Sequence, residues 1–214
     1  MKDSTINQIE ILTQKYQGLQ YVKPYILEAL DLMVESFEKG KKLLICGNGG
    51  SAADGDRMAG ALLKSFAKER PISQRVVEKI SKVAPEEVEF FVKNLEQGLP
   101  VISLSNQPSF LTAYSNDKDY DVAFANEVLA YGRKGDTLFA ISTSGNSRNV
   151  ILAALVAKSL GMNVIALTGD FDSKLKEIAD VTIKAPSQQA LRIHELHLPI
   201  YQALCLAVEE EMFD

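Results

Sequence analysis

The sequence is poor in the residues that build disulfides and cysteine-bound metal clusters. Its 214 residues include two cysteines, two histidines and no tryptophan. Cys46 and Cys205 both lie in apolar runs, and no CxxC spacing occurs. The sequence therefore offers neither a disulfide framework nor a cysteine zinc site. We expect two buried, reduced thiols, since free cysteine is among the most buried residue types.

Long apolar runs and an excess of positive charge are missing as well. No apolar run approaches the roughly 20 residues of a membrane-spanning helix, and the first residues, MKDSTINQIE, lack the apolar core of a signal peptide. The formal net charge of −5 argues against sequence-independent nucleic-acid binding, which needs a cationic surface. The sequence thus predicts a cytoplasmic protein without a membrane or nucleic-acid partner. Local binding of a small anion remains compatible with this charge.

Helical spacing dominates the start of the chain. Within residues 1–40, apolar side chains recur every three or four positions, which is the period of a helix. Pro24 interrupts this pattern, because proline lacks an amide proton and crowds the preceding turn. We expect a helical N-terminal arm of two helices, or of one kinked helix.

Strand-like and helical segments alternate after the arm. Short runs rich in Val, Ile and Leu are typical of strands buried on both faces, and they cover residues 41–47, 99–105, 136–143, 162–169 and 180–186. The helical segments are 52–66, 108–115, 121–132, 147–160, 171–178 and 188–212. This alternation predicts a single α/β domain over residues 1–214, with a doubly wound parallel sheet. Its ligands should bind outside the carboxyl ends of the strands.

Residues 71–98 break the alternation. They form two helical runs separated at Ala84-Pro85, between the first crossover helix and the second strand. Such a helical insertion can cap the edge of the sheet or contact another subunit. It can also act as a lid or bind a partner. The sequence leaves these alternatives open.

Two loops at predicted strand ends combine glycines with hydroxyl side chains. CGNGGS (46–51) follows the first strand, and STSGNS (142–147) follows the third strand. Glycines let the backbone approach a ligand, and exposed amides at a helix start favour an anion. Either loop alone is compatible with a tight turn or a helix cap, but together they predict a phosphate cradle. Neither fits GxGxxG or GxxxxGK[ST], so no dinucleotide or Walker-type site is indicated.

These loops and several further segments resemble the sugar isomerase (SIS) domain family, and within it the phosphoheptose isomerases. The segments are ICGNGGSAAD, the Asn116-Asp117 pair, GDTLFAISTSGNSRNVILAA, GMNVIALTG and RIHELHLPIYQALCLAVEEEM. The resemblance spans nearly the whole chain except residues 71–98. It implies a three-layer, flavodoxin-like fold with a five-stranded parallel sheet, in a homotetramer with active sites shared between subunits. By the same resemblance the phosphosugar is held by Asn48, Gly49, Gly50, Ser51, Asp117, Ser142, Thr143, Ser144 and Ser147.

The resemblance fails at the catalytic positions. Phosphoheptose isomerases isomerise sedoheptulose 7-phosphate with an acid/base pair beside a bound metal, commonly zinc. Their helix after GGS carries a histidine and a glutamate where this chain has Arg57 and Ala61, and their last helix carries a glutamine and a histidine where it has His194 and Gln202. Arginine has no lone pair for a metal, and alanine has no ligand atom. We therefore expect the family's zinc site to be lost and no cofactor to be bound.

Other side chains near these positions are candidates for acid/base chemistry. They are Asp54 on the helix after GGS and His194, Glu195 and His197 on the last predicted helix. A histidine titrates near neutral pH, and Glu195 is suited to act as a general base. Arg57 is suited to stabilise an enediolate, or to bind a carboxylate or a second phosphate. Alternatively, these groups pair with neighbouring helices across an oligomer, and Arg57 is an ordinary surface arginine.

Two functions are compatible with these observations, and both predict a phosphorylated sugar as the ligand. The first is aldose-ketose isomerisation of a sugar phosphate such as sedoheptulose 7-phosphate, in carbohydrate metabolism. Its predicted catalytic residues are His194, Glu195, His197 and Arg57. The second is a non-catalytic regulator with a degenerate metal site, which senses a phosphosugar or interacts with another protein.

Overall fold

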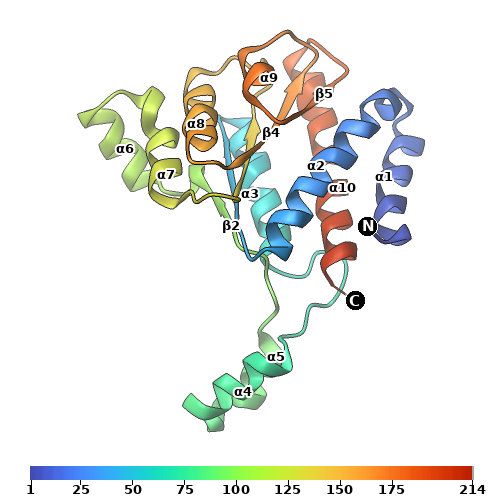
Figure 1. Ribbon diagram of the computed structural model, residues 1–214, viewed down its shortest axis with the longest axis vertical. Helices are drawn as coiled ribbons and strands as arrows, with labels where there is room; N and C mark the ends of the chain where they lie inside the picture. The colour runs from blue at the N-terminus through green and yellow to red at the C-terminus, as the bar shows by residue number, and fades with distance from the viewer. Residues whose placement is uncertain (214) are drawn as a thin grey trace.

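Five short strands form one parallel sheet in the computed structural model, which describes residues 1–213 (Figure 1). The strands are β1 (Leu43–Gly47), β2 (Val101–Ser103), β3 (Thr137–Ile141), β4 (Asn163–Gly169) and β5 (Val181–Ala185). Their order in the sheet is β2-β1-β3-β4-β5, which is the flavodoxin-like order with its switch point between β1 and β3. Every residue of β1 and β3 is buried, as a parallel sheet covered on both faces requires. The predicted fold class is confirmed.

Helices cover both faces of the sheet and enclose two cores. The first face carries α2 (Lys23–Glu38), α3 (Gly50–Leu63) and α10 (Ala190–Met212), and the second carries α6 (Pro108–Asp117), α7 (Ala123–Tyr131), α8 (Arg148–Ser159) and α9 (Lys174–Ile178). Along β1, Leu43 and Ile45 belong to the first core, whereas Leu44 and Cys46 belong to the second. This alternation follows from the two-residue period of a strand.

The N-terminal arm consists of separate helical pieces, as the sequence indicates. They are α1 (Asp3–Lys15), the short 3₁₀ helix η1 (Gln17–Val22) and α2. Pro24 lies in the first turn of α2, where its missing amide proton has no helical partner to lose. The proline therefore starts a helix instead of kinking one. Helix α1 packs along α10 (Figure 1).

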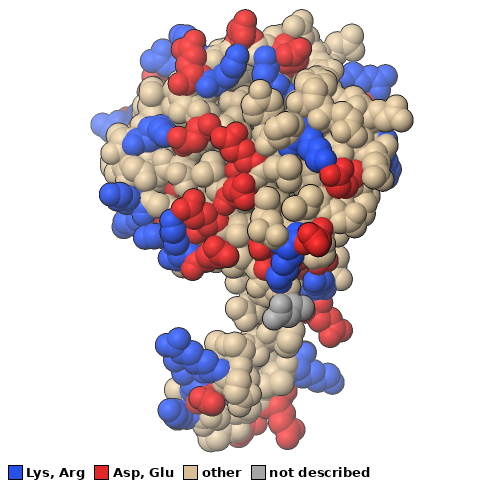
Figure 2. All heavy atoms as spheres, turned by 45° about the vertical axis from the view of Figure 1, so that its right-hand side comes forward, with Lys and Arg blue, Asp and Glu red and all other residues tan. Residues whose placement is uncertain are grey.

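The inserted residues form a hairpin of helices that projects from the body (Figures 1 and 2). It contains α4 (Gln74–Val83), the 3₁₀ turn η2 (Pro85–Glu87) and α5 (Val88–Asn94), so the predicted break at Ala84-Pro85 is confirmed. Neither α4 nor α5 has a buried residue. One of the alternatives, a cap over the sheet edge, does not fit the structure, because the hairpin projects from the body (Figure 1) and its two connections pair at Pro71 and Glu96. Its roles as a subunit contact, as a lid or as a partner-binding element stay predictions.

The base of this hairpin is fixed to α10 by a buried ion pair. Arg70 Nη2 lies 2.7 Å from Glu209 Oε1, and both side chains are almost fully buried. Glu209 also accepts the amides of Phe66 and Ala67 at 2.9 and 2.7 Å. The charged pair therefore joins the end of the first crossover to the last helix.

Both cysteines are buried and free, as expected. Burial raises the pKa of Cys46 and that of Cys205 to about 12. Neither thiol is therefore reactive at neutral pH. In the described part of the chain, residues 1–213, no helix has the length and apolar character that crossing a membrane requires.

Candidate functional site

The two glycine-containing loops start at neighbouring strand ends. Strands β1 and β3 pair in parallel with Gly47 opposite Ile141, so both loops leave the sheet at the same level. Helix α3 begins at Gly50 and helix α8 begins at Arg148. Two helix N-termini therefore flank one edge of the sheet, and N-termini attract anions through their free amides and their dipoles.

The first loop requires glycine for steric reasons. Gly49 has a φ of 55°, a conformation that side-chain-bearing residues rarely adopt. A Cβ at Gly47 would lie 2.9 Å from Ser51. Ser51 is buried, and its amide donates to the Asn48 carbonyl at 3.0 Å. This tight packing places the hydroxyl of Ser51 in the first turn of α3.

A reciprocal amide pair joins the two loops. Asn48 Nδ2 donates to Asn149 Oδ1 at 2.8 Å, and Asn149 Nδ2 donates to Asn48 Oδ1 at 2.8 Å. The Tyr120 hydroxyl donates to Asn48 Oδ1 at 3.1 Å. The sequence predicted Asn48 as a phosphosugar-binding residue, but it did not predict Asn149 or Tyr120. A polar residue in the first turn of α8 was the only local signal for Asn149.

The second loop gathers its hydroxyl groups around the start of α8. The hydroxyls of Ser142 and Ser147 lie 3.0 Å apart, and the Ser144 hydroxyl accepts the Asn146 amide at 3.1 Å. Gly145 has a φ of 65°, and a Cβ there would lie 2.4 Å from Ser173 Oγ. The Thr143 carbonyl accepts the Gly169 amide at 2.8 Å. The loop is thus held in place by the end of β4 and by Ser173.

Asp117 comes from the segment that follows the second strand. It is the last residue of α6, is exposed, and accepts a hydrogen bond from Asn116 Nδ2 at 3.0 Å. Within residues 1–213 it makes no hydrogen bond to either loop. Tyr120 is the nearest residue along the chain that contacts the first loop.

A second polar cluster borders the first loop and consists of Asp54, His194 and His197. Asp54 Oδ2 lies 3.5 Å from His194 Nδ1, and Asp54 Oδ1 accepts the Tyr201 hydroxyl at 3.2 Å. A Cβ on Gly50 would lie 2.9 Å from the His194 ring. The cluster therefore connects α3, α10 and the backbone of the first loop.

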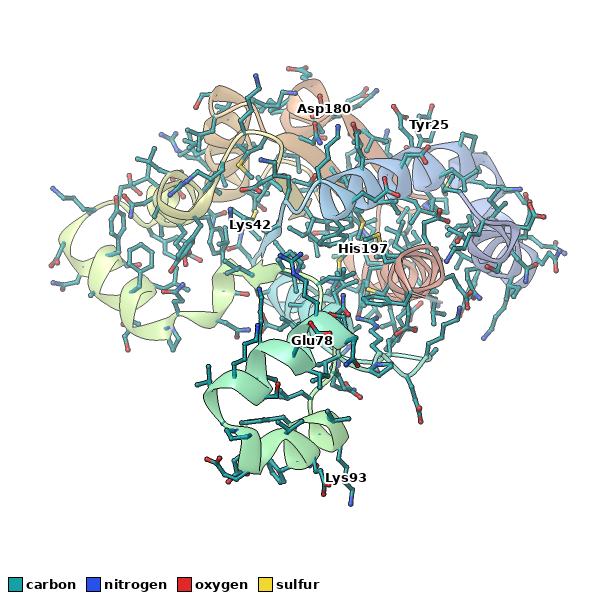
Figure 3. All side chains as sticks on the ribbon, turned by 60° about the horizontal axis from the view of Figure 1, so that its bottom comes forward. Tyr25, Lys42, Glu78, Lys93, Asp180 and His197 are labelled. Carbon is teal, nitrogen blue, oxygen red and sulfur yellow. The ribbon has the colours of Figure 1, made fainter. Side chains whose placement is uncertain are left out.

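His197 is the buried member of this cluster, and Figure 3 places it in the interior of the body. Its Nε2 lies 3.2 Å from the Thr168 carbonyl oxygen. Burial lowers the pKa of His197 to about 4, although the Thr168 carbonyl opposes the shift. The imidazole is therefore neutral at pH 7. Burial also raises the pKa of Tyr201 to about 12, and Asp54 adds to this rise while Arg57 opposes it.

Arg57, Ala61 and Gln202 line a different pocket, with a volume of about 290 Å³. Its other lining residues are Gly60, Lys64, Phe66, Tyr201 and Cys205. The Arg57 guanidinium has no lone pair and the Ala61 methyl has no ligand atom. These side chains therefore do not fit the zinc ligand set that the resemblance implies.

Glu195 lies outside the cluster. Its exposed carboxylate accepts from Arg192 Nη1 at 2.6 Å on the same helix. The structure thus brings together two of the four predicted catalytic residues, His194 and His197. Both lie on α10 and face Asp54 on α3. Arg57 is linked to this group through Tyr201.

Comparisons with known proteins extend these observations. The sequence profile of the SIS domain matches residues 17–101 and 91–169. The phosphoheptose isomerase of Alteromonas mediterranea is 35% identical over 210 residues, which are 97% of this chain and 93% of the relative. Among solved structures, a phosphoheptose isomerase from Francisella tularensis matches with a TM-score of 0.75 at 29% identity. The match covers 92% of this chain and 91% of the Francisella chain. Phosphoheptose isomerase GmhA from Neisseria gonorrhoeae has a TM-score of 0.71 at 30% identity, with coverages of 92% and 94%.

Proposed function

This chain belongs to the SIS domain family and, within it, to the family of the phosphoheptose isomerases, and from that membership we propose that it is a phosphosugar isomerase. The reaction is aldose-ketose isomerisation of a sugar phosphate such as sedoheptulose 7-phosphate. One observation carries the proposal: the two loops at the ends of β1 and β3 are joined into one unit by the Asn48–Asn149 amide pair. The non-catalytic regulator is not favoured, since the relatives compared above are named as isomerases.

The phosphoryl group is the anchor of the substrate in this proposal. A phosphate dianion offers acceptor oxygens, and the loops offer hydroxyl donors together with the free amides of two helix N-termini. The proposed contacts to the phosphoryl group are the hydroxyls of Ser51, Ser142, Thr143, Ser144 and Ser147. Asn48 and Asp117 are proposed to lie near the sugar, with Gly49 and Gly50 giving backbone access.

The proton transfer is assigned to groups beside the first loop. Aldose-ketose isomerisation moves a proton between adjacent carbons, so it needs a base and stabilisation of an enediolate. His194 is suited to the first task because its ring is 36% exposed and contacts Gly50. Asp54 lies 3.5 Å from His194 and orients the ring. His197 is buried behind it and supports the site instead of reaching solvent.

Arg57 and Glu195 have separate proposed roles. The Arg57 guanidinium lines the adjacent pocket, where it can neutralise an enediolate or a carboxylate. Glu195 is exposed and paired with Arg192, so it acts only on a substrate that lies against the outer face of α10. Such a position suits an active site shared between subunits, and we propose that the protein is a homotetramer. We also propose a cytoplasmic location. Light scattering after size-exclusion chromatography tests the subunit number.

The reaction is tested by following exchange of the substrate's transferable C–H proton with solvent deuterium. We expect exchange with sedoheptulose 7-phosphate, and a loss of at least about tenfold in Ser144→Ala/Ser147→Ala, since each hydrogen bond to a charged group stabilises by about 1.5–3 kcal/mol. Ser81→Ala serves as the control, because Ser81 is an exposed hydroxyl on the projecting hairpin. Absence of exchange across a panel of phosphosugars would contradict the proposal.

A further inference from the structure

The cluster of Asp54, His194 and His197 has the composition of a metal site. Each residue offers one ligand atom, and the three atoms all lie within 4.8 Å of one another. From this arrangement we propose that the chain binds a divalent transition-metal ion of the zinc type through Asp54, His194 and His197. This ligand set differs from the one that the phosphoheptose isomerases use, because only His194 occupies one of those positions.

Two atoms of the cluster are buried without a hydrogen-bond partner. They are Asp54 Oδ2 and His197 Nδ1. Buried polar atoms without partners are uncommon in folded proteins, because each loses its hydration without compensation. A cation bound between these two acceptor atoms satisfies both of them.

The tautomer of His197 is fixed in the form that binds a metal. A carbonyl oxygen only accepts, so His197 Nε2 carries the proton that it donates to Thr168 at 3.2 Å. Nδ1 therefore keeps its lone pair. Metal-binding histidines usually donate their second ring N–H to a carbonyl or a carboxylate in this way, which orients the ring. The Tyr201 hydroxyl donates to Asp54 Oδ1 at 3.2 Å and leaves Oδ2 for the ion.

One spacing in the cluster is close to that of a loaded site. Zinc binds histidine nitrogen and carboxylate oxygen at about 2.0–2.2 Å, so two ligand atoms of a tetrahedral site lie about 3.4 Å apart. Asp54 Oδ2 and His194 Nδ1 are 3.5 Å apart. The other separations in the cluster are at most 4.8 Å, so the side chains would have to move closer together around an ion.

The composition of the cluster also limits the choice of ion. Two imidazoles and one carboxylate suit zinc, cobalt and iron(II) better than calcium or magnesium, which prefer all-oxygen sites. Three protein ligands leave a coordination position open beside the first loop. An ion bound there would supply a Lewis acid for a hydroxyl or carbonyl oxygen of the substrate. In the metal-loaded protein His194 would then be a ligand and not the base.

A charged hydrogen-bonded network is the alternative explanation of the cluster. A protonated His194 beside Asp54 accounts for the 3.5 Å contact between their side chains. It leaves His197 Nδ1 without a partner. The metal ion accounts for all three side chains at once, and for this reason we favour it.

Cobalt(II) titration of metal-free protein without a histidine tag tests the site directly, in the absence of sugar. Four-coordinate cobalt(II) absorbs in the visible range, and we expect a saturable signal with one ion per chain. His194→Ala and Asp54→Asn should each weaken cobalt binding at least tenfold. Glu195→Gln is the matched control, because Glu195 neighbours His194 on α10 but pairs with Arg192, and its binding should equal that of wild type. Zinc calorimetry provides an independent affinity.

The outcomes separate this inference from the proposed reaction. His197→Ala is avoided because the side chain is fully buried, and thermal melting of each metal-free variant verifies that it is folded. Folded wild-type protein that gives no saturable cobalt signal overturns the site, and so do folded His194→Ala and Asp54→Asn variants that bind as tightly as wild type. Because no substrate is present, a protein that binds cobalt without isomerising a sugar contradicts only the proposed function.

Discussion

At the scale of single residues, Glu127 is the side chain whose environment conflicts most with its charge. It lies on α7, is 3% exposed, and neither carboxylate oxygen has a hydrogen-bond partner. Burial raises the pKa of Glu127 to about 7. The folded protein therefore holds this proton more tightly than the unfolded chain does.

This raised pKa predicts a pH-dependent stability. The folded pKa of Glu127 exceeds the unfolded value of 4.5, so its contribution to stability is complete below about pH 4.5 and is lost as the pH rises to 7. Glu127→Gln should remove this loss and raise the free energy of unfolding at pH 8 by about 3 kcal/mol, since one pKa unit corresponds to about 1.4 kcal/mol. Urea unfolding at pH 5 and pH 8 measures the effect.

The exposed Glu89 on the projecting hairpin supplies the control for this prediction. Glu89→Gln should retain the wild-type difference between the two pH values. If the free energy of unfolding changed equally between pH 5 and pH 8 in wild type and in Glu127→Gln, Glu127 would ionise in the folded protein without a cost in stability.

At the scale of elements, the junction of the hairpin base with α10 depends on one buried charge pair. Burial alone would raise the pKa of Glu209, but the amides of Phe66 and Ala67 and the Arg70 guanidinium lower it overall. Arg70 also donates to the Leu62 carbonyl at 2.9 Å, at the end of α3. Removing either charge would leave the other one buried without its partner.

Arg70→Met should therefore lower the free energy of unfolding by about 3–5 kcal/mol, the usual cost of breaking a buried ion pair. Arg70→Met combined with Glu209→Gln should cost less than the sum of the two single changes, because the double variant has no unpaired buried charge. Denaturant unfolding of all three variants gives the coupling free energy. Additive costs would mean that the two charges do not stabilise each other.

The sequence predicted elements well wherever a local pattern determines them. The five strands and the helices that follow them were predicted from apolar runs and spacing, and the breaks predicted at Pro24 and Ala84-Pro85 lie at helix starts. The second strand is shorter than expected, Val101–Ser103 against residues 99–105, since the chain turns into a 3₁₀ helix at Leu104. As the edge strand it pairs only with β1, which allows an early turn.

The candidate site was predicted only in part, because many of its contacts join distant parts of the chain. Glycines and hydroxyls marked both loops, but the Asn48–Asn149 pair spans 101 positions and Tyr201 reaches Asp54 across 147. No local pattern reports such contacts. The same limit explains why the partners of His197 and the outward position of Glu195 emerged only from the fold.

At the scale of the whole molecule, the projecting hairpin stands apart from the two cores. Figure 2 shows it beneath the body with Lys, Arg, Asp and Glu on its surface, and Figure 3 shows Glu78 and Lys93 on it. Its large apolar side chains include Val83 at 86% and Phe90 at 61% exposure. Because α4 and α5 bury no residue, the hairpin contributes little to the stability of the body.

Deletion of the hairpin tests this independence. Pro71 and Glu96 pair in an antiparallel bridge, so an Asn-Gly turn can replace residues 72–95, since two-residue turns of this type join directly paired positions. We expect the free energy of unfolding of the body to change by less than about 1 kcal/mol, as for other changes that remove no buried contact. A larger loss would mean that the hairpin packs against the body or against another subunit. Light scattering of the deleted protein distinguishes these two cases, since only the loss of a subunit contact lowers the number of chains per particle. If the hairpin is a lid, its deletion changes turnover while the particle mass stays constant.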